Sequence, residues 1–349
     1  MMFFFACGLL SACKEKVVIE EVERSQTLSN VRVVYTPGGL GDRDLQDEIY
    51  KGILMRDRFK DEEIDFIMEN YCLEEFELQE IAIADWFEDP QTGTYKNRLL
   101  ILADNRYVDY LLEHPEWKIP EGDAVLALNY PYPLPEPWQN VYTRAISSYA
   151  SAYMGAHIMK FLGRKHPTIV CSNFKDIMQR EICDGFIDGL HDVGIEFDER
   201  KDIQYLDSLY EGYAMSDFLY EFSTIIEHDD DYRYDFVVPA CGNSIQGLLR
   251  YTREHPETFL TCGVNVDQQF YSNKVAFSTI KDMQKLVDHF LGSWLAGEDI
   301  ETNAVYGFES IYSDIVISYS YEDKYRIIED LYPSVFNKML EAEKEYLKR

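Results

Sequence analysis

The chain has 349 residues, enough for two domains of ordinary size, and its composition is that of a globular protein. It carries 33 lysines and arginines against 63 aspartates and glutamates, which gives a formal charge of −30. Such a charge repels nucleic acids and anionic membranes, so neither is an expected partner. The sequence contains no apolar run of the roughly 18 residues that a spanning helix needs, which excludes a multi-span transporter.

The first residues resemble a lipoprotein leader. Residues 1–12 (MMFFFACGLLSA) are almost entirely apolar and too short to cross a bilayer, which is typical of a signal-peptide core. Residues 10–13 (LSAC) resemble a bacterial lipobox and are followed at once by charged residues, although no basic residue precedes the apolar core. We therefore expect a signal peptide over 1–13, lipidation of Cys13, a polar tether over 14–29 and a protein held at the cell envelope outside the cytoplasm by its lipid anchor alone.

The first half of the chain alternates short apolar runs with amphipathic stretches. The spacing of Leu45, Ile49, Ile53 and Leu54 predicts a helix. Residues 129–137 are rich in proline and are not expected to be helical, because proline lacks a backbone donor and biases its predecessor toward extended geometry. Strands are predicted at 31–35, 78–84, 98–103 and 123–129.

The same alternation then starts again, with Ser147 or Ser148 as the expected cap of a helix that reaches about Leu162. Further strands are predicted at 167–172, 202–206, 234–242, 258–265 and 274–280. Further helices are predicted at 180–194, 218–227, 245–256, 281–295 and 332–349. Strand–helix alternation repeated in two halves predicts an α/β protein with two doubly wound parallel-sheet lobes.

Several kinds of chemistry have no signature in the sequence. The histidines form no H-x-x-x-H or H-E-x-x-H, and there is no G-x-S-x-G, G-x-G-x-x-G or phosphate-binding G-x-x-x-x-G-K-[ST]. The five cysteines after the leader form no C-x-x-C, and the acidic run 227–235 lacks the spacing of a metal cage. We therefore expect no catalytic residues, no metal and no cofactor. The glycine-rich turn 38–41 is followed by four carboxylates within 42–48, which disfavour an anion and favour a hydroxyl-rich or cationic ligand.

Five segments, in this order, resemble the basic membrane protein family of bacterial substrate-binding lipoproteins, whose best understood members bind purine nucleosides. Residues 38–52 (GGLGDRDLQDEIYKG) look like the first strand-to-helix loop of that family, and residues 149–155 (YASAYMG) look like its crossing into the second lobe. Residues 236–242 (FVVPACG) are similar to its late strand and turn. Residues 263–268 (GVNVDQ) match G-V-D-x-D-Q with one change, and residues 278–281 (STIK) match S-x-x-K.

The resemblance implies a type I periplasmic-binding fold, in which two lobes joined by a three-strand hinge close on a ligand. It places residues 30–145 and 265–306 in lobe 1, and residues 146–264 and 307–349 in lobe 2. The implied protein is a monomeric receptor that delivers a small, nucleoside-like solute to an ABC permease. A sensor of the same fold without an importer, a receptor for a flavin-like or other aromatic solute and, less favoured, an enzyme on the same scaffold are the alternatives.

The same resemblance implies the ligand-binding residues. A nucleoside needs hydrogen-bonding groups for its ribose and an aromatic platform for its base. The candidate contacts are Asp42, Leu45, Gln46, Asn129, Gly242, Asn265 and Lys281. The candidate stacking residues are Tyr130, Phe174 and Trp86.

Each of these candidates also has a purely structural interpretation, such as a helix cap, a turn or core packing. Leu45 stands where the family has a stacking phenylalanine, Gln46 where it has an asparagine, and both Asn129 and Asn265 where it has aspartate. Exchanging a carboxylate for an amide weakens a charged hydrogen bond by roughly 1 kcal/mol, so the fold is expected to transfer better than the ligand.

Overall fold

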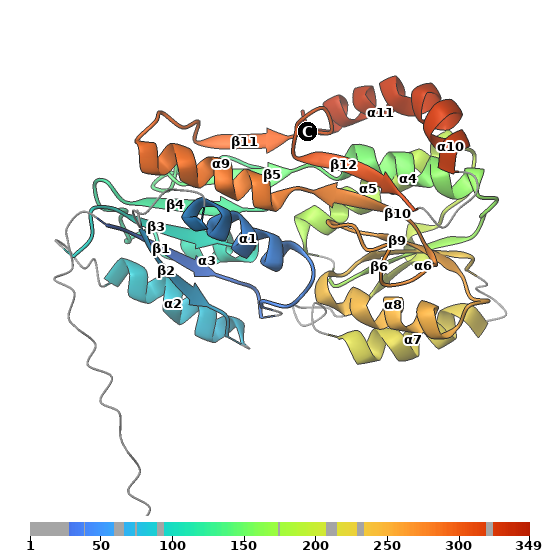
Figure 1. Cartoon of the computed structure of the whole chain (residues 1–349), viewed down its shortest axis with the longest axis horizontal. Helices are drawn as coiled ribbons and strands as arrows, with labels where there is room; N and C mark the ends of the chain where they lie inside the picture. The colour runs from blue at the N-terminus through green and yellow to red at the C-terminus, as the bar shows by residue number, and fades with distance from the viewer. Residues whose placement is uncertain are drawn as a thin grey trace, which may run out of the picture.

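The computed structural model describes residues 28–37, 39–58, 66–73, 75–88, 94–173, 175–206, 215–228, 234–318 and 324–349. Cys13, most of the predicted tether and Phe174 lie outside these residues. Two α/β lobes lie side by side, each built on a six-stranded sheet (Figure 1). The predicted fold class is therefore confirmed at the level of its architecture.

The sheet of lobe 1 has the strand order β11-β5-β4-β3-β1-β2, and its neighbouring strands pair in parallel. Its central strands are buried on both faces, which explains their nearly continuous runs of valine, leucine and isoleucine. The strands are β1 (Ser29–Val34), β2 (Phe66–Tyr71), β3 (Arg98–Leu102), β4 (Ala124–Leu128), β5 (Tyr142–Ile146) and β11 (Asn303–Tyr306).

Helices cover both faces of this sheet. Helices α1 (Leu45–Arg58) and α9 (Met283–Ala296) pack on one face, and α2 (Phe76–Glu88) and α3 (Arg106–Leu112) pack on the other. The prediction of a strand at 78–84 is wrong, because this segment belongs to α2. The buried side chains of α2 are Phe76, Gln79, Ala82, Ile83 and Trp86, and their spacing of three to four residues is helical.

The sheet of lobe 2 has the order β12-β10-β9-β8-β6-β7. Its pairs are parallel except β10–β12, which is antiparallel, so this sheet is mixed rather than purely parallel. The strands are β6 (Pro167–Cys171), β7 (Ile203–Tyr205), β8 (Phe236–Ala240), β9 (Leu260–Gly263), β10 (Val275–Lys281) and β12 (Ser313–Ile317).

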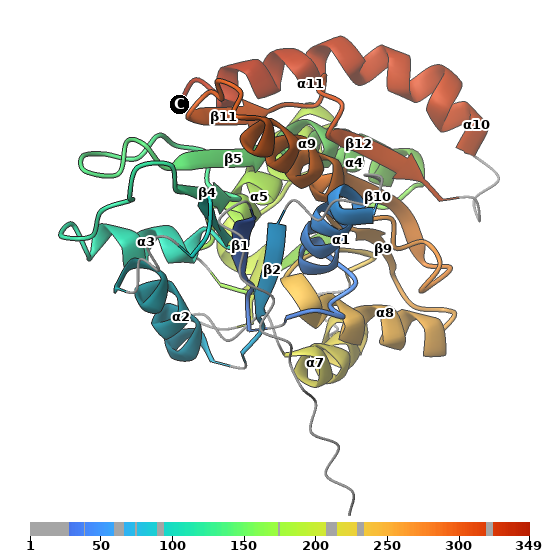
Figure 2. The same cartoon turned by 60° about the vertical axis from the view of Figure 1, so that its left-hand side comes forward.

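Lobe 2 has a tightly packed helical face. Helices α4 (Tyr149–Phe161), α5 (Ile177–Asp192) and α11 (Tyr332–Tyr346) share one core cluster, with α11 lying across the outside of the lobe (Figure 2). Helices α7 (Ser216–His228) and α8 (Ile245–Glu254) cover the opposite face. Short helical turns complete the lobe: α6 (Glu199–Asp202), η2 (Gly242–Ser244), α10 (Lys324–Arg326) and η3 (Ile327–Leu331).

Three segments connect the lobes. The chain passes from β5 to α4, from β10 to α9 and from β11 to β12. The connections are tied together, since the Ser147 backbone N–H donates to Tyr306 and the Asp282 backbone N–H donates to Tyr312. The predicted lobe boundary at residue 265 is wrong for residues 275–281, because β10 pairs with β9 and β12 in the sheet of lobe 2.

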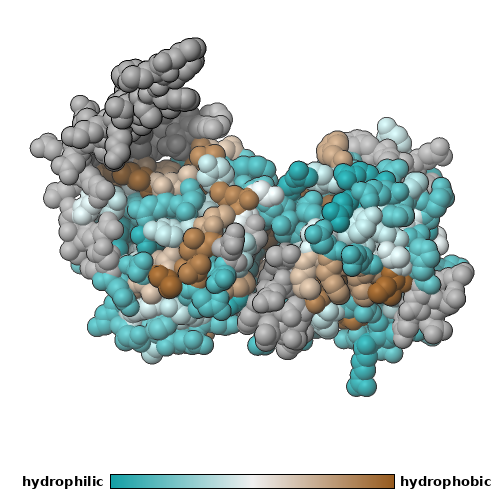
Figure 3. Space-filling model, turned by 90° about the horizontal axis from the view of Figure 1, so that it is seen from below, coloured by the Kyte–Doolittle hydropathy of each residue, from teal (hydrophilic) through white to brown (hydrophobic). Residues whose placement is uncertain are grey.

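The surface agrees with the hydrophilic composition. Hydrophilic residues dominate the face seen in Figure 3, and hydrophobic residues form limited patches on each lobe. Among the described helices, none combines the length and the apolar character that a bilayer crossing requires.

Candidate ligand-binding site

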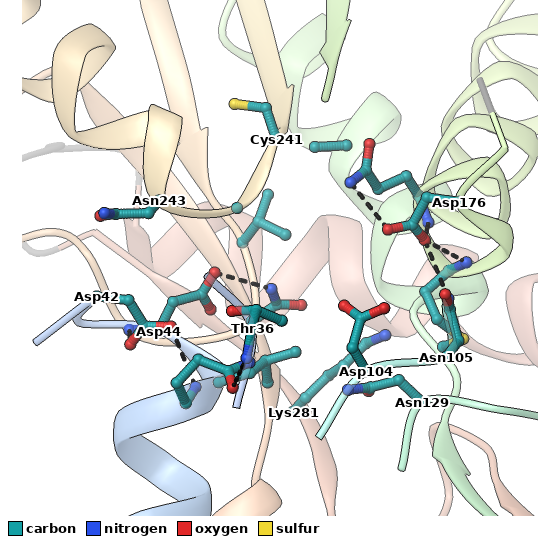
Figure 4. A pocket seen from close by; sticks show the side chains of 18 of the residues that line it. Thr36, Asp42, Asp44, Asp104, Asn105, Asn129, Asp176, Cys241, Asn243 and Lys281 are labelled. Carbon is teal, nitrogen blue, oxygen red and sulfur yellow. Dashed lines mark hydrogen bonds between the residues drawn. The ribbon is translucent and has the colours of Figure 1, made fainter. Parts of the chain in front are cut away.

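A cavity of about 80 Å³ lies between the two lobes (Figure 4). Strands of both sheets end at this cavity, which is where open α/β sheets bind ligands. Lobe 1 contributes Thr36, Asp42, Asp44, Leu45, Gln46, Asp104, Asn105 and Asn129. The remaining lining residues are Asp176, Met178, Gln179, Ile182, Ala240, Cys241, Gly242, Asn243, Val264, Asn265 and Lys281.

Asp42 organises the loop between β1 and α1. Its carboxylate accepts hydrogen bonds from the backbone N–H groups of Asp44 at 2.9 Å, Gln46 at 3.1 Å and Asp47 at 3.2 Å. These bonds satisfy donors at the start of α1 that have no partner within the helix. Burial nevertheless holds the pKa of Asp42 above its ordinary value. Asp42 therefore lines the cavity and caps the helix at the same time.

Asp44 faces Asn265 across the cleft. The Asn265 side-chain amide donates to Asp44 Oδ2 at 3.3 Å, whereas Asp44 Oδ1 is buried without a hydrogen-bond partner among the described residues. Burial, with the neighbouring carboxylate of Asp42, raises the pKa of Asp44 well above its usual range. A buried acceptor without a donor is costly in free energy, so this oxygen is a position where a ligand donor would be favoured.

Asp104 and Asn105 lie in the turn between β3 and α3, after Ala103. Asp104 Oδ1 accepts the backbone N–H of Arg106 at 2.9 Å. Burial, followed by the charge of Asp176, raises the pKa of Asp104 to about 7. The Asn105 side-chain amide donates to Asp176 Oδ1 at 3.4 Å and so links lobe 1 to the N-cap of α5.

Lys281 ends β10 and is the one lining residue with a cationic side chain in the described part of the chain. Only 2 % of it is exposed. Its ammonium makes no ion pair within the described residues. Burial lowers the pKa of Lys281, although the nearby charges of Glu181, Asp176 and Asp44 oppose the shift. The ammonium is therefore available to an acceptor on a ligand.

The backbone explains three of the predicted site residues. Asn129 and Asn265 adopt left-handed φ angles of 60° and 67° where they follow β4 and β9, and Gly242 adopts 55° where it follows β8. Asparagine and glycine tolerate this region far better than other residues do. The Asn129 side-chain amide donates to the Ala103 carbonyl at 3.3 Å, which leaves its Oδ1 buried without a partner among the described residues.

The predicted aromatic platforms do not reach the cavity. Trp86 is buried in the core of lobe 1, where Arg98 lies 4.4 Å over its ring. Tyr130 packs at the edge of the same core, meets Tyr132 edge-on and does not line the cavity, and its contact with a ligand stays a prediction. Among the described residues, no aromatic side chain lines the cavity, and Phe174 lies outside them.

Sequence reasoning brings together most of the cavity but omits several polar residues. Of the predicted contacts, the structure places Asp42, Leu45, Gln46, Asn129, Gly242, Asn265 and Lys281 in its lining. The residues that it omits include Asp44, Asp104, Asn105, Asp176 and Gln179. Asp104 and Asn105 directly follow a strand that was predicted, so the general rule that ligands bind at the carboxyl ends of strands would have found them.

The structure resembles solved solute-binding proteins and transcription regulators. No protein-family model and no curated protein matches the chain. An ABC transporter solute-binding protein of Aeropyrum pernix K1 superposes with a TM-score of 0.62 at 12% identity, over 92% of this chain and 86% of that one.

Two further structures have the same architecture. The transcription regulator CcpA of Lactococcus lactis gives a TM-score of 0.60 at 16% identity, over 85% of this chain and 100% of that one. The glucose-galactose binding protein GanP of Geobacillus stearothermophilus gives 0.56 at 11% identity, over 83% and 97%. The chain thus has a type I periplasmic-binding fold, which is the fold of solute-binding proteins and of regulators that share it.

Proposed function

We propose that this protein is an extracytoplasmic receptor that closes its two lobes around a small polar solute and delivers it to an ABC permease. The observation that carries the proposal is the inter-lobe cavity, which hydrogen-bonding side chains from both lobes line and in which Asp44 Oδ1 and Asn129 Oδ1 have no hydrogen-bond partner among the described residues. Concave sites of this kind, with few precisely placed polar groups, are typical of small-molecule binding. The proposal includes a monomer, no catalytic step and a lipid anchor at Cys13.

The cleft of the structure is closed. Gln246 of lobe 2 donates to the Asp42 carbonyl at 3.4 Å, and the Arg43 guanidinium lies 5.2 Å over the ring of Tyr271 across the lobes. A cavity of about 80 Å³ is far below the roughly 300 Å³ at which pockets for drug-sized ligands begin. A solute of nucleoside size would therefore enter through an opened hinge and hold the lobes further apart than they are here.

A nucleoside is the ligand class that the family resemblance favours. The carboxylate and amide oxygens of Asp44, Asp104 and Asn129 suit the hydroxyl groups of a ribose. A base would also need an aromatic platform, for which Phe174 is the remaining candidate from the sequence. Polar recognition is thus better supported in the described residues than base stacking is.

Solute binding is tested on protein purified without refolding. Native mass spectrometry would identify a co-purifying solute, and thermal shift across nucleosides, sugars, amines and vitamins would find others. A specific ligand at a hundredfold excess over Kd should stabilise the fold by about 2.7 kcal/mol. Small-angle scattering should show that the same ligand changes the separation of the lobes. A folded protein with no bound solute and no response across the panel would contradict the proposal.

The anchor needs a separate test. Metabolic labelling with a fatty-acid analogue should label the wild-type protein and should leave Cys13→Ala unlabelled, with Cys72→Ala as a control that keeps the label. Co-purification with a permease would favour import, whereas capture of a signalling protein would favour a sensor. Labelling that survives Cys13→Ala would refute the predicted lipobox.

A further inference from the structure

The carboxylates of the cavity fall into two groups according to their hydrogen bonds. Asp42 and Asp176 each accept at least two backbone N–H groups, at the starts of α1 and α5. Asp44 and Asp104 accept fewer hydrogen bonds from the protein. Asp44 is only 5% exposed, yet its Oδ1 has no hydrogen-bond partner among the described residues. Asp104 accepts one backbone N–H, through Oδ1.

The unpaired acceptors line the same cavity. Figure 4 shows the carboxylate of Asp104 turned toward the space between the lobes, with Asn129 next to it and Asp44 across that space. Asn129 Oδ1 is a further buried acceptor without a partner among the described residues. Buried acceptors are rarely left unpaired in proteins. We therefore expect a ligand in this cavity to supply hydrogen-bond donors to these oxygens.

The charges of the lining decide which donors fit best. Asp42, Asp44, Asp104 and Asp176 line the cavity, and Lys281 is their one cationic companion among the described lining residues. A hydroxyl group would satisfy an acceptor but would not compensate the negative charge that an ionised carboxylate carries in a desolvated site. An ammonium group would do both, and a charge-assisted hydrogen bond is about twice as strong as a neutral one.

We propose that the solute of this receptor is a small aliphatic amine, bound in its protonated form by Asp44 and Asp104, with an oxygen acceptor for Lys281. Amino sugars, amino alcohols and amino acids have this combination of groups. The inference rests on the proposed function, because it names the chemical class of the solute that the cleft would hold.

The electrostatic surroundings of both carboxylates agree with this assignment. Asp176 and Asp109 face Asp104 with like charge, and Arg106 partly offsets them. Asp42 faces Asp44 with like charge, and Lys281 partly offsets it. Both carboxyl groups therefore hold a proton more readily than usual in the empty cleft. An arriving ammonium would displace that proton, so binding of an amine should release protons and should strengthen as the pH rises toward about 8.

The assignment can be tested by calorimetry on the full chain with matched probes. Glucosamine, ethanolamine and serine would each be compared with its N-acetyl derivative, which keeps the oxygen atoms but removes the positive charge. Adenosine would serve as an uncharged nucleoside. We expect at least one free amine to bind, its N-acetyl derivative to bind at least tenfold more weakly, and the enthalpy to vary with the buffer because protons are released.

Variants then identify the carboxylates. Asp44→Asn and Asp104→Asn should each weaken amine binding at least tenfold, while the exposed Asp109→Asn, which removes the same charge from α3, should not. If one of these two variants fails to fold, the amine affinity of the other still tests the assignment. Amine affinity unchanged in the folded variants, or silence of all three amines, overturns the assignment.

The two proposals fail in different ways. Binding of adenosine or of an N-acetyl derivative without the free amines overturns the amine assignment and leaves the receptor function standing. A response to none of these probes, together with no co-purifying solute and no response in the wider panel, overturns both.

Discussion

Asp104→Asn should stabilise the empty protein, and by an amount that grows with pH. The pKa of Asp104 is raised from 3.8 to about 7, chiefly by burial, so the folded state binds its proton more tightly than the unfolded chain does. Between about pH 4 and about pH 7, the unfolded chain has lost this proton whereas the folded protein still holds it. The free energy of unfolding of the wild type therefore falls as the pH rises through this range. An asparagine removes that dependence, and its Oδ1 can still accept the Arg106 backbone N–H.

The pKa shift of Asp104 sets the size of the expected stabilisation by Asp104→Asn. Each pKa unit corresponds to about 1.4 kcal/mol, so the full shift is worth about 4 kcal/mol at high pH. A buried amide has its own desolvation cost, and we expect about 2–4 kcal/mol of stabilisation near pH 8 and almost none near pH 4.

Urea denaturation of wild type and Asp104→Asn across this pH range would measure the difference, with m-values compared to check two-state behaviour. The exposed Asp109→Asn on α3, the helix that follows Asp104, is the control for loss of one charge, and its difference from wild type should stay small at both ends of the range. A variant that is destabilised at pH 8, or shifted equally at every pH, would refute the reasoning that Asp104 is a destabilising buried charge.

Three further predictions concern the fold and the hinge. Gly185→Ala should destabilise the protein by about 1–3 kcal/mol in urea, because the new Cβ would lie 2.3 Å from the Tyr149 carbonyl oxygen; unchanged stability would contradict the close packing of α4 and α5. Asn265→Val should be about 1–2 kcal/mol less stable than Asn265→Gly by thermal unfolding, since φ is 67° there; equal stabilities would argue against the left-handed conformation. Asn105→Ala removes the bond to Asp176 and should favour the open form by about 1 kcal/mol, seen as a larger radius in scattering; an unchanged radius would count against this bond as a latch.

The fold was predictable wherever an element is long and buried on a regular period. The β-branched run at 31–35 and the apolar run at 98–103 correspond to β1 and β3, whose strands are buried on both faces. Strands β2, β5, β11 and β12 were not predicted. Strand β2 lies at the edge of its sheet and is only partly buried, and the other three lie beside the connections between the lobes. The pairing of all four depends on partners distant in the sequence, which local patterns do not record.

The error at α2 has a different origin. The segment 78–84 alternates apolar and polar residues over a few positions, which is the pattern of a strand, but its buried positions continue to Trp86 on a helical period. The pattern of buried residues over the whole segment from Phe76 to Trp86 therefore indicates a helix. Trp86, which the sequence analysis names as a candidate stacking residue, lies on this helix and belongs to the core of lobe 1.

The candidate site was predictable to the extent that it follows from strand ends. Asn129 and Asn265 were taken from the family resemblance, and the structure adds that each follows a strand and has a left-handed backbone. Asp176 is harder to find, since it lies several residues beyond β6 and reaches the cavity through the start of α5. The hydrogen bonds that separate Asp42 from Asp44 depend on the three-dimensional loop, and no spacing rule distinguishes the two carboxylates.

Lys281 and Asp282 are adjacent in the chain but belong to different lobes. Lys281 ends β10 in the cavity, with its backbone N–H bonded to the Asn265 carbonyl at 2.8 Å, and Asp282 caps α9 in lobe 1. The peptide unit between them therefore joins the lining of the cavity to a connection between the lobes. A substitution at Lys281 would act on both, so we expect ligand preference and the relative placement of the lobes to change together at this position.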